Sequence, residues 1–205
     1  MLDDATLCRS VMNRLLAEAG LPPLSVQRYQ AVFDFPVEVY YRRIGFPLDT
    51  RAFEHVGTQF MAGYEQARHT CRLRSGTRRA LAHLHRAGVV QAMLSAYPHV
   101  TLEAVLEERG LHRHFTHIMG ASDHYGRGKT HQAHALRACL PATSKVVLIG
   151  DTLHDAEVAR AIGADCLLIC GGHQARHRLA ATGCPVFTSL TRAAAWVTGD
   201  STDVR

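Results

Sequence analysis

Apolar residues in the first third of the chain recur at helical rather than alternating spacing. Leu7, Val11, Leu15 and Leu16 mark one face of a segment that ends at Gly20, as expected for an amphipathic helix. Proline-containing breaks divide the following residues into shorter amphipathic pieces. The pattern predicts a small helical bundle with helices over residues 5–20, 25–32, 37–44 and 51–69.

The pattern changes near Ser75, where short apolar runs begin to alternate with amphipathic segments. Such alternation is typical of an α/β fold, a Rossmann-like doubly wound parallel sheet with helices on both faces. The expected strands cover residues 89–95, 116–119, 145–150, 165–170 and 185–187. The expected helices cover residues 77–87, 100–109, 130–139, 153–162, 176–182 and 190–197.

The composition is that of a globular protein, since 47% of the 205 residues are hydrophobic and 20% are charged. No apolar run approaches the roughly 20 residues that span a bilayer, and the acidic start of the chain does not look like a secretory signal. Six scattered cysteines indicate reduced thiols. The formal net charge of +5 is spread thinly. We therefore expect a cytoplasmic protein with neither a membrane nor a nucleic-acid partner.

Several polar residues fall at predicted strand ends, where parallel sheets bind ligands. Asp151 ends the strand over 145–150, and Asp155 follows four residues later, in the first helical turn. Paired carboxylates there suit Mg²⁺, although a helix cap would also explain them. Ser95 ends the strand over 89–95 and offers a hydroxyl to an anion, or is a turn residue. Lys129 follows Tyr125-Gly126-Arg127-Gly128 and could neutralise a phosphate, or be a surface lysine.

The order of these residues is more specific than any one of them. A strand-end serine, a loop lysine and Gly-Asp-x-x-x-Asp 22 residues after the lysine resemble motifs of the haloacid-dehalogenase-like (HAD) superfamily, in its phosphoglycolate-phosphatase-like branch. The resemblance implies a core over residues 1–8 and 72–205 and an all-helical cap over 9–71. It implies Mg²⁺-dependent hydrolysis of a small phosphorylated metabolite. Ser95 and Lys129 would bind phosphate, with Lys129 neutralising charge, and Asp151 and Asp155 would hold Mg²⁺.

The sequence departs from that family at its first motif. A strand ending in Asp-x-Asp-Gly-Thr normally supplies the aspartate nucleophile and the general acid, and the 205 residues contain no such motif. Leu2-Asp3-Asp4 resembles the residues that follow it. We expect a chain that lacks the first core strand, truncated at its N-terminus and inactive as it stands. The alternative is a non-catalytic phosphate- and Mg²⁺-binding pseudo-phosphatase. After Ser95, Ala96 stands where the family often has asparagine.

Other readings of the chain have less support. Gly128-Lys129-Thr130 resembles the end of a nucleotide-binding P-loop, but Asp123 stands where that motif needs glycine. His112, His114 and His117 could form a metal site, but in a chain with 14 histidines surface positions are the simpler expectation. Cys166 and Cys170 share a strand face and are expected in the core.

Overall fold

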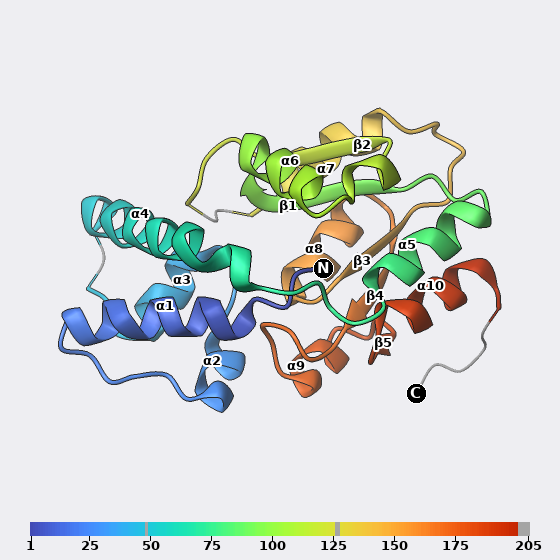
Figure 1. Cartoon of the computed structure of the whole chain (residues 1–205). Coiled ribbons are helices and arrows are strands. Elements are labelled where there is room, and N and C mark those ends of the chain that lie inside the picture. Colours follow the sequence, from blue (N-terminus) through green and yellow to red (C-terminus); the bar gives the residue numbers. More distant parts are fainter. Residues whose placement is uncertain (48, 126–127, 201–205) are drawn as a thin grey trace.

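The computed structural model describes residues 1–47, 49–125 and 128–200. Its N-terminal part consists of four helices that pack on one another, at the left of Figure 1. They are α1 (Ala5–Glu18), α2 (Val26–Val32), α3 (Val37–Arg43) and α4 (Thr50–Ala67), followed by the short 3-10 helix η1 (Arg68–Thr70). Side chains at helical spacing, among them Met12, Leu16, Tyr40 and Phe53, form their common core. The predicted division into core and cap stays a prediction.

The rest of the described chain alternates strands and helices, which confirms the α/β fold class. The strands are β1 (Ala92–Pro98), β2 (His117–Ala121), β3 (Val147–Gly150), β4 (Asp165–Ile169) and β5 (Val186–Phe187). The helices are α5 (Thr77–Arg86), α6 (His99–Glu108), α7 (Thr130–Ala138), α8 (Leu153–Ala161), α9 (Arg176–Ala180) and α10 (Leu190–Thr198). A 3-10 turn, η2 (His112–His114), precedes β2. Apart from η2, which was not predicted, these elements lie within three residues of the predicted bounds.

The strands form two separate parallel sheets (Figure 1). One has the order β1-β2 and the other has the order β3-β4-β5. Among the described residues β1 pairs only with β2, and β3 pairs only with β4. Both β1 and β3 are half-buried along their length, whereas Leu167, Leu168 and Ile169 of β4 are fully buried. β1 and β3 therefore each present one free, partly apolar edge.

The first strand corrects one detail of the sequence analysis. Residues 89–91 belong to no strand, and β1 runs past the predicted end at Ser95 as far as Pro98. Its regular pairing with β2 stops at Leu94, after which the register shifts. Ser95 therefore lies inside an irregular strand and not at its end. The Gln91 side chain turns to α5 and donates to the carbonyl of Leu81 at 3.1 Å.

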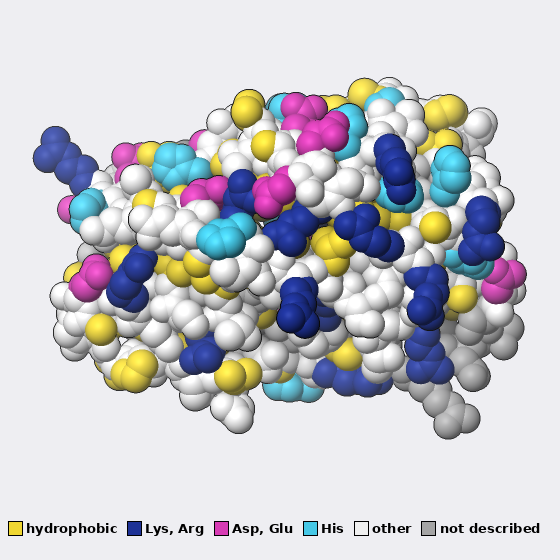
Figure 2. Space-filling view, viewed as in Figure 1, with side chains coloured by type: hydrophobic (Ala, Val, Ile, Leu, Met, Phe, Trp, Pro, Cys, Tyr) yellow, Lys and Arg dark blue, Asp and Glu magenta, His cyan; other side chains and the backbone are white. Residues whose placement is uncertain are grey.

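The hydropathy of the helices, the spread of charge and the state of the cysteines can be compared with the composition. None of the described helices is both long and apolar enough to cross a bilayer. Lys and Arg side chains are spread over the face seen in Figure 2, among uncharged areas. The six cysteines are free thiols, and Cys8 and Cys71 are buried. Cys139 is the exposed one.

Candidate active site

The connection between β3 and α8 is organised around the carboxylate of Asp155. Its Oδ2 accepts hydrogen bonds from the backbone N–H of Asp151 at 3.0 Å, from the N–H of Thr152 at 2.9 Å and from the Thr152 hydroxyl at 2.7 Å. A first-turn acid that reaches back to free N–H groups is a common way to start a helix. Gly150 makes the close approach possible, because a Cβ there would overlap the carboxylate. Asp155 is thereby held in place.

Lys129 completes the surroundings of Asp155. Its Nζ lies 2.6 Å from Oδ1 of Asp155, and the two side chains are 14% and 4% exposed. The backbone N–H of Lys129 donates to Nε2 of His154 at 3.1 Å, which ties the start of α7 to α8. Burial alone would raise the pKa of Asp155, but Lys129 and Thr152 outweigh it and lower that pKa to about 2. The Asp155 carboxyl is therefore ionised at neutral pH.

The carboxylate of Asp151 points to a different set of partners. Its Oδ2 lies 3.5 Å from Nη1 of Arg74, and the Asp151 side chain is 32% exposed. Arg74 also donates to the carbonyl of Cys170 at 2.6 Å, so it bridges the ends of β3 and β4. Gly172 lies against the same carboxylate, where a Cβ would overlap Oδ2. Sequence reasoning missed Arg74, because it lies 77 positions from Asp151 with no motif of its own.

Ser95 makes its hydrogen bond to a residue outside this group. Its Oγ accepts a hydrogen bond from the backbone N–H of Tyr97 at 3.1 Å, which is a local turn contact. Within the described part of the chain, no hydrogen bond or ion pair joins Ser95 to Lys129, Asp151 or Asp155. The structure thus brings together three of the four predicted residues. Gly126 and Arg127 of the predicted lysine loop lie outside the described residues.

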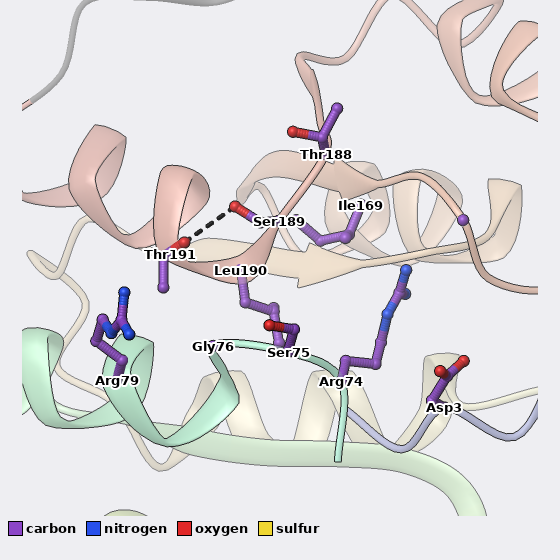
Figure 3. A pocket seen from close by; sticks show the side chains of 11 residues that line it. Asp3, Arg74, Ser75, Gly76, Arg79, Ile169, Thr188, Ser189, Leu190 and Thr191 are labelled. Atoms are coloured by element: carbon purple, nitrogen blue, oxygen red, sulfur yellow. Dashed lines mark hydrogen bonds between the residues drawn. The ribbon is translucent and has the colours of Figure 1, made fainter. Parts of the chain in front are cut away.

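A hollow of about 280 Å³ opens beside the pair of Arg74 and Asp151. Figure 3 shows Arg74 and Asp3 at one end of it and Arg79 and Thr191 at the other. Its remaining lining comes from the start of α5, the end of β4 and the start of α10. The predicted phosphate-binding residues do not line it. Arg74 is the link between this hollow and the β3 end.

The helical part of the chain is tied to the loop that follows β4. The buried Gln174 side chain accepts from the N–H of Leu153 at 2.7 Å and donates to the carbonyl of Phe33 at 2.8 Å. Phe35 packs on the ring of His154, with centroids 5.4 Å apart. The residues after α2 therefore sit over the start of α8, next to Asp155. No sequence motif marked Gln174.

The carboxylates offer Mg²⁺ the oxygen donors that it prefers. Asp155 already accepts three hydrogen bonds on Oδ2 and pairs with Lys129 through Oδ1. Asp151 is the more available ligand, since its ion pair with Arg74 is long and its side chain is partly exposed. The residues fit a divalent cation held chiefly by Asp151.

Comparison with known proteins decides the family. A sequence profile of haloacid dehalogenase-like hydrolases matches residues 1–169, which is most of the chain. The chain belongs to this family. The matched HAD segment includes Ser95, Lys129, Asp151 and Asp155.

Individual relatives of this HAD chain differ in what they do. The tyrosine-protein kinase PtkA of Mycobacterium tuberculosis is 35% identical over 95 residues, which cover 45% of this chain and 33% of the kinase. The chain thus spans about a third of the length of the curated kinase relatives that it matches. A phosphoglycolate phosphatase of Cereibacter sphaeroides is 28% identical over 183 residues, covering 83% of this chain and 84% of the phosphatase.

Solved structures confirm the HAD-like fold. A putative haloacid dehalogenase-like hydrolase of Bacteroides fragilis superposes with a TM-score of 0.81 at 16% identity, covering 94% of each chain. The structure of Mycobacterium tuberculosis PtkA superposes with a TM-score of 0.70 at 28% identity, covering 85% of this chain and 81% of that one. The same Rossmann-like architecture therefore underlies relatives that are named for different activities.

Proposed function

We propose that this chain is the phosphate- and Mg²⁺-binding part of a HAD-type phosphatase for a small phosphorylated metabolite in the cytoplasm. The observation that carries the proposal is the buried ion pair of Lys129 and Asp155 beside Asp151, at the carboxyl end of β3. Ligands of parallel sheets bind at this end of the strands. Phosphatases among the relatives, which match over most of their length, support the same reaction class.

Each residue would have a separate role in this proposal. Lys129 would neutralise negative charge on the phosphoryl group, and Asp155 holds the Lys129 ammonium in position. Asp151 would be the main Mg²⁺ ligand and Asp155 would contribute a further oxygen, and bound Mg²⁺ would shield the charge of the phosphoryl oxygens. Ser95 would offer its hydroxyl to phosphate. Arg74 restrains Asp151 from the side of β4.

Hydrolysis also needs a nucleophile, and the acids near the start of the chain are poorly suited. Asp4 precedes α1 and accepts a hydrogen bond from the Tyr64 hydroxyl at 2.7 Å. Asp3 is exposed at the rim of the hollow next to Arg74. Neither acid ends a strand, which is where the family motif places its nucleophile. We therefore propose that these 205 residues bind phosphate and Mg²⁺ without hydrolysing phosphomonoesters.

The free edges of β1 and β3 suggest how activity could be restored. A strand ending in Asp-x-Asp-Gly-Thr, fused ahead of Leu2, would have unpaired backbone groups on both sides to bond with. We propose that the first core strand belongs there, with the core over residues 1–8 and 72–205 and the helical cap over residues 9–71.

The experiment compares hydrolysis of p-nitrophenyl phosphate by the 205-residue chain and by this fused version. We expect Mg²⁺-dependent hydrolysis from the fused version alone. In that version Lys129→Gln should lower the rate by about 100-fold, and Lys145→Gln should leave it unchanged, since Lys145 is 81% exposed on the far end of β3. A rate of hydrolysis that is changed neither by Mg²⁺ removal nor by Lys129→Gln would contradict the proposed site.

A binding role is the alternative that keeps the same residues. A pseudo-phosphatase would bind Mg²⁺ and inorganic phosphate through Asp151 and Lys129 and never turn over. Calorimetry on the 205-residue chain, with Asp151→Asn and Lys129→Gln as variants, measures that binding directly. Binding in the native chain together with an inactive fused version would favour this alternative.

The likeness to PtkA favours a second candidate, phosphoryl transfer to a protein tyrosine. Transfer to a tyrosine hydroxyl and transfer to water need the same charge neutralisation by Lys129. The fused version incubated with ATP and a tyrosine-containing acceptor protein tests it. Phosphotyrosine formation that disappears in Lys129→Gln would support a kinase, and release of inorganic phosphate alone would exclude it.

A further inference from the structure

A second cluster of metal-ligand side chains lies next to the β3 end, since its member His173 directly follows Gly172, which touches the Asp151 carboxylate. Ligand atoms of Asp4, Cys8 and His173 all lie within 4.8 Å of one another, and no other group of three such residues does so in the described ranges. Oδ1 of Asp4 and Nε2 of His173 are 3.3 Å apart. Cys8 is buried, and the Asp4 and His173 side chains are 18% and 17% exposed. The cluster is therefore largely enclosed.

The fold builds this cluster from two elements far apart in the sequence. Asp4 precedes α1 and Cys8 lies within its first turn, so their four-residue spacing places them on one helix face. His173 follows β4 after Gly171 and Gly172. Gly171 has a φ of +84°, a left-handed conformation that suits glycine and turns the chain towards α1.

Two buried tyrosines support the cluster from outside. The Tyr29 hydroxyl lies 2.7 Å from Nδ1 of His173. The Tyr64 hydroxyl donates to Oδ2 of Asp4 at 2.7 Å. A histidine that binds a metal through one ring nitrogen commonly donates its other N–H to an oxygen, and ligating carboxylates are in turn hydrogen-bonded. Tyr29 and Tyr64 leave Nε2 of His173 and Oδ1 of Asp4 facing each other and the thiol of Cys8.

We propose that Asp4, Cys8 and His173 bind a zinc-type divalent cation. One sulfur, one imidazole nitrogen and one carboxylate oxygen suit Zn²⁺ or Co²⁺ and are a poor set for Mg²⁺, which prefers oxygen. Three protein ligands leave a fourth tetrahedral position for water or a substrate oxygen. Binding converts the Cys8 thiol to a thiolate and releases its proton to solvent. This site shares no ligand with the one proposed at Asp151.

The test is a Co²⁺ titration of the metal-free 205-residue chain, followed by competition with Zn²⁺ and with excess Mg²⁺. We expect one equivalent of Co²⁺ with the absorption of a sulfur-ligated tetrahedral ion, displaced by Zn²⁺ and not by Mg²⁺. Cys8→Ser should abolish the sulfur-to-metal absorption and weaken Zn²⁺ binding by more than about 100-fold. Cys71→Ser, which changes another buried thiol, should keep the sulfur-to-metal absorption and the Zn²⁺ affinity.

Further variants test the proposal even if Cys8→Ser fails to fold. His173→Gln should weaken Zn²⁺ binding as strongly, and Tyr29→Phe should weaken it by about 10- to 100-fold, because Tyr29 acts only through His173. X-ray absorption of the Co²⁺ complex should show one sulfur ligand. Absence of sulfur ligation in the native chain, or displacement by Mg²⁺, would overturn the proposal. The cluster would then be a hydrogen-bonded junction between α1 and the loop after β4.

Discussion

The Lys129 ammonium lies 2.6 Å from Oδ1 of Asp155, and both side chains are almost removed from solvent. Asp155 also accepts three hydrogen bonds on its other oxygen from Asp151 and Thr152. One carboxylate thus holds the start of α8, the end of β3 and the residue before α7 together. Ion pairs of this kind fix geometry more than they add stability, because burial of the charges offsets their attraction.

Replacing one partner of the Lys129–Asp155 ion pair should therefore lower the stability of the fold. Asp155→Asn leaves the Lys129 charge buried without a counter-ion, and we expect the free energy of unfolding to fall by about 3–5 kcal/mol. Urea denaturation measures it. Asp165→Asn is the matched control, because Asp165 pairs with Lys145 at 3.7 Å and both side chains are exposed. That variant should lose less than about 1 kcal/mol. Equal losses of stability in the two variants would contradict the idea that burial makes the Lys129–Asp155 pair costly to break.

The Lys129–Asp155 ion pair also predicts that the stability of the fold depends on pH. The pKa of Asp155 is lowered from an ordinary 3.8 to about 2 in the folded chain. A lowered pKa stabilises the fold above the ordinary value, and this contribution is lost as the pH falls from about 4 to about 2. Its size is about 2 kcal/mol. Protonated Asp155 resembles asparagine, so the stability gap between the native chain and Asp155→Asn should narrow across this range. A gap that stays constant in urea denaturation at each pH would show that Asp155 does not titrate there.

The helices were predictable from sequence because their end signals are local. Ser25 accepts from the N–H of Arg28 and begins α2, and Gly199 in a left-handed conformation ends α10. The first strand was misplaced because its bounds depend on pairing with β2, 25 positions away, and not on its own apolar residues. Val89 and Val90 are apolar, but the pairing with β2 begins only at Ala92.

The candidate site was predictable only in part. Asp151, Asp155 and Lys129 occur at strand and helix ends, so topology alone brings them to one edge. Which atoms meet is decided by packing. The sequence offered a helix cap as one explanation of Asp155, but it did not indicate that Asp155 would pair with Lys129 or that Arg74 would hold Asp151. Arg74 and Asp151 are 77 positions apart, and such a contact leaves no local pattern to recognise.

Gln174 should couple the helical part of the chain to α8. Gln174→Leu keeps much of the volume but removes the partners of the Leu153 N–H and the Phe33 carbonyl. Each buried group left without a partner costs about 1–3 kcal/mol, so a loss of at least about 2 kcal/mol in urea denaturation is expected. Gln59→Leu on the exposed face of α4 is the control and should change stability by less than about 0.5 kcal/mol. A Gln174 variant as stable as the control would show that these bonds are replaced by water.

Gly172 should be required for the position of Asp151. Alanine there would place a Cβ on Oδ2 of Asp151 and 3.2 Å from Nη1 of Arg74, so the carboxylate would have to turn away. We expect a loss of about 1–3 kcal/mol from overpacking, together with weaker Mg²⁺ binding measured by calorimetry.

The matched control for that change is Gly57→Ala in α4. Its new Cβ would meet Tyr125 Cδ1 at an ordinary 3.4 Å, and alanine is favoured over glycine in a helix by up to about 1 kcal/mol. Gly57→Ala should therefore be neutral or stabilising and should leave Mg²⁺ binding unchanged. If Gly172→Ala lost stability but kept Mg²⁺ affinity, the cation would not depend on the present orientation of Asp151. The ligand role proposed for that carboxylate would then have to pass to another residue.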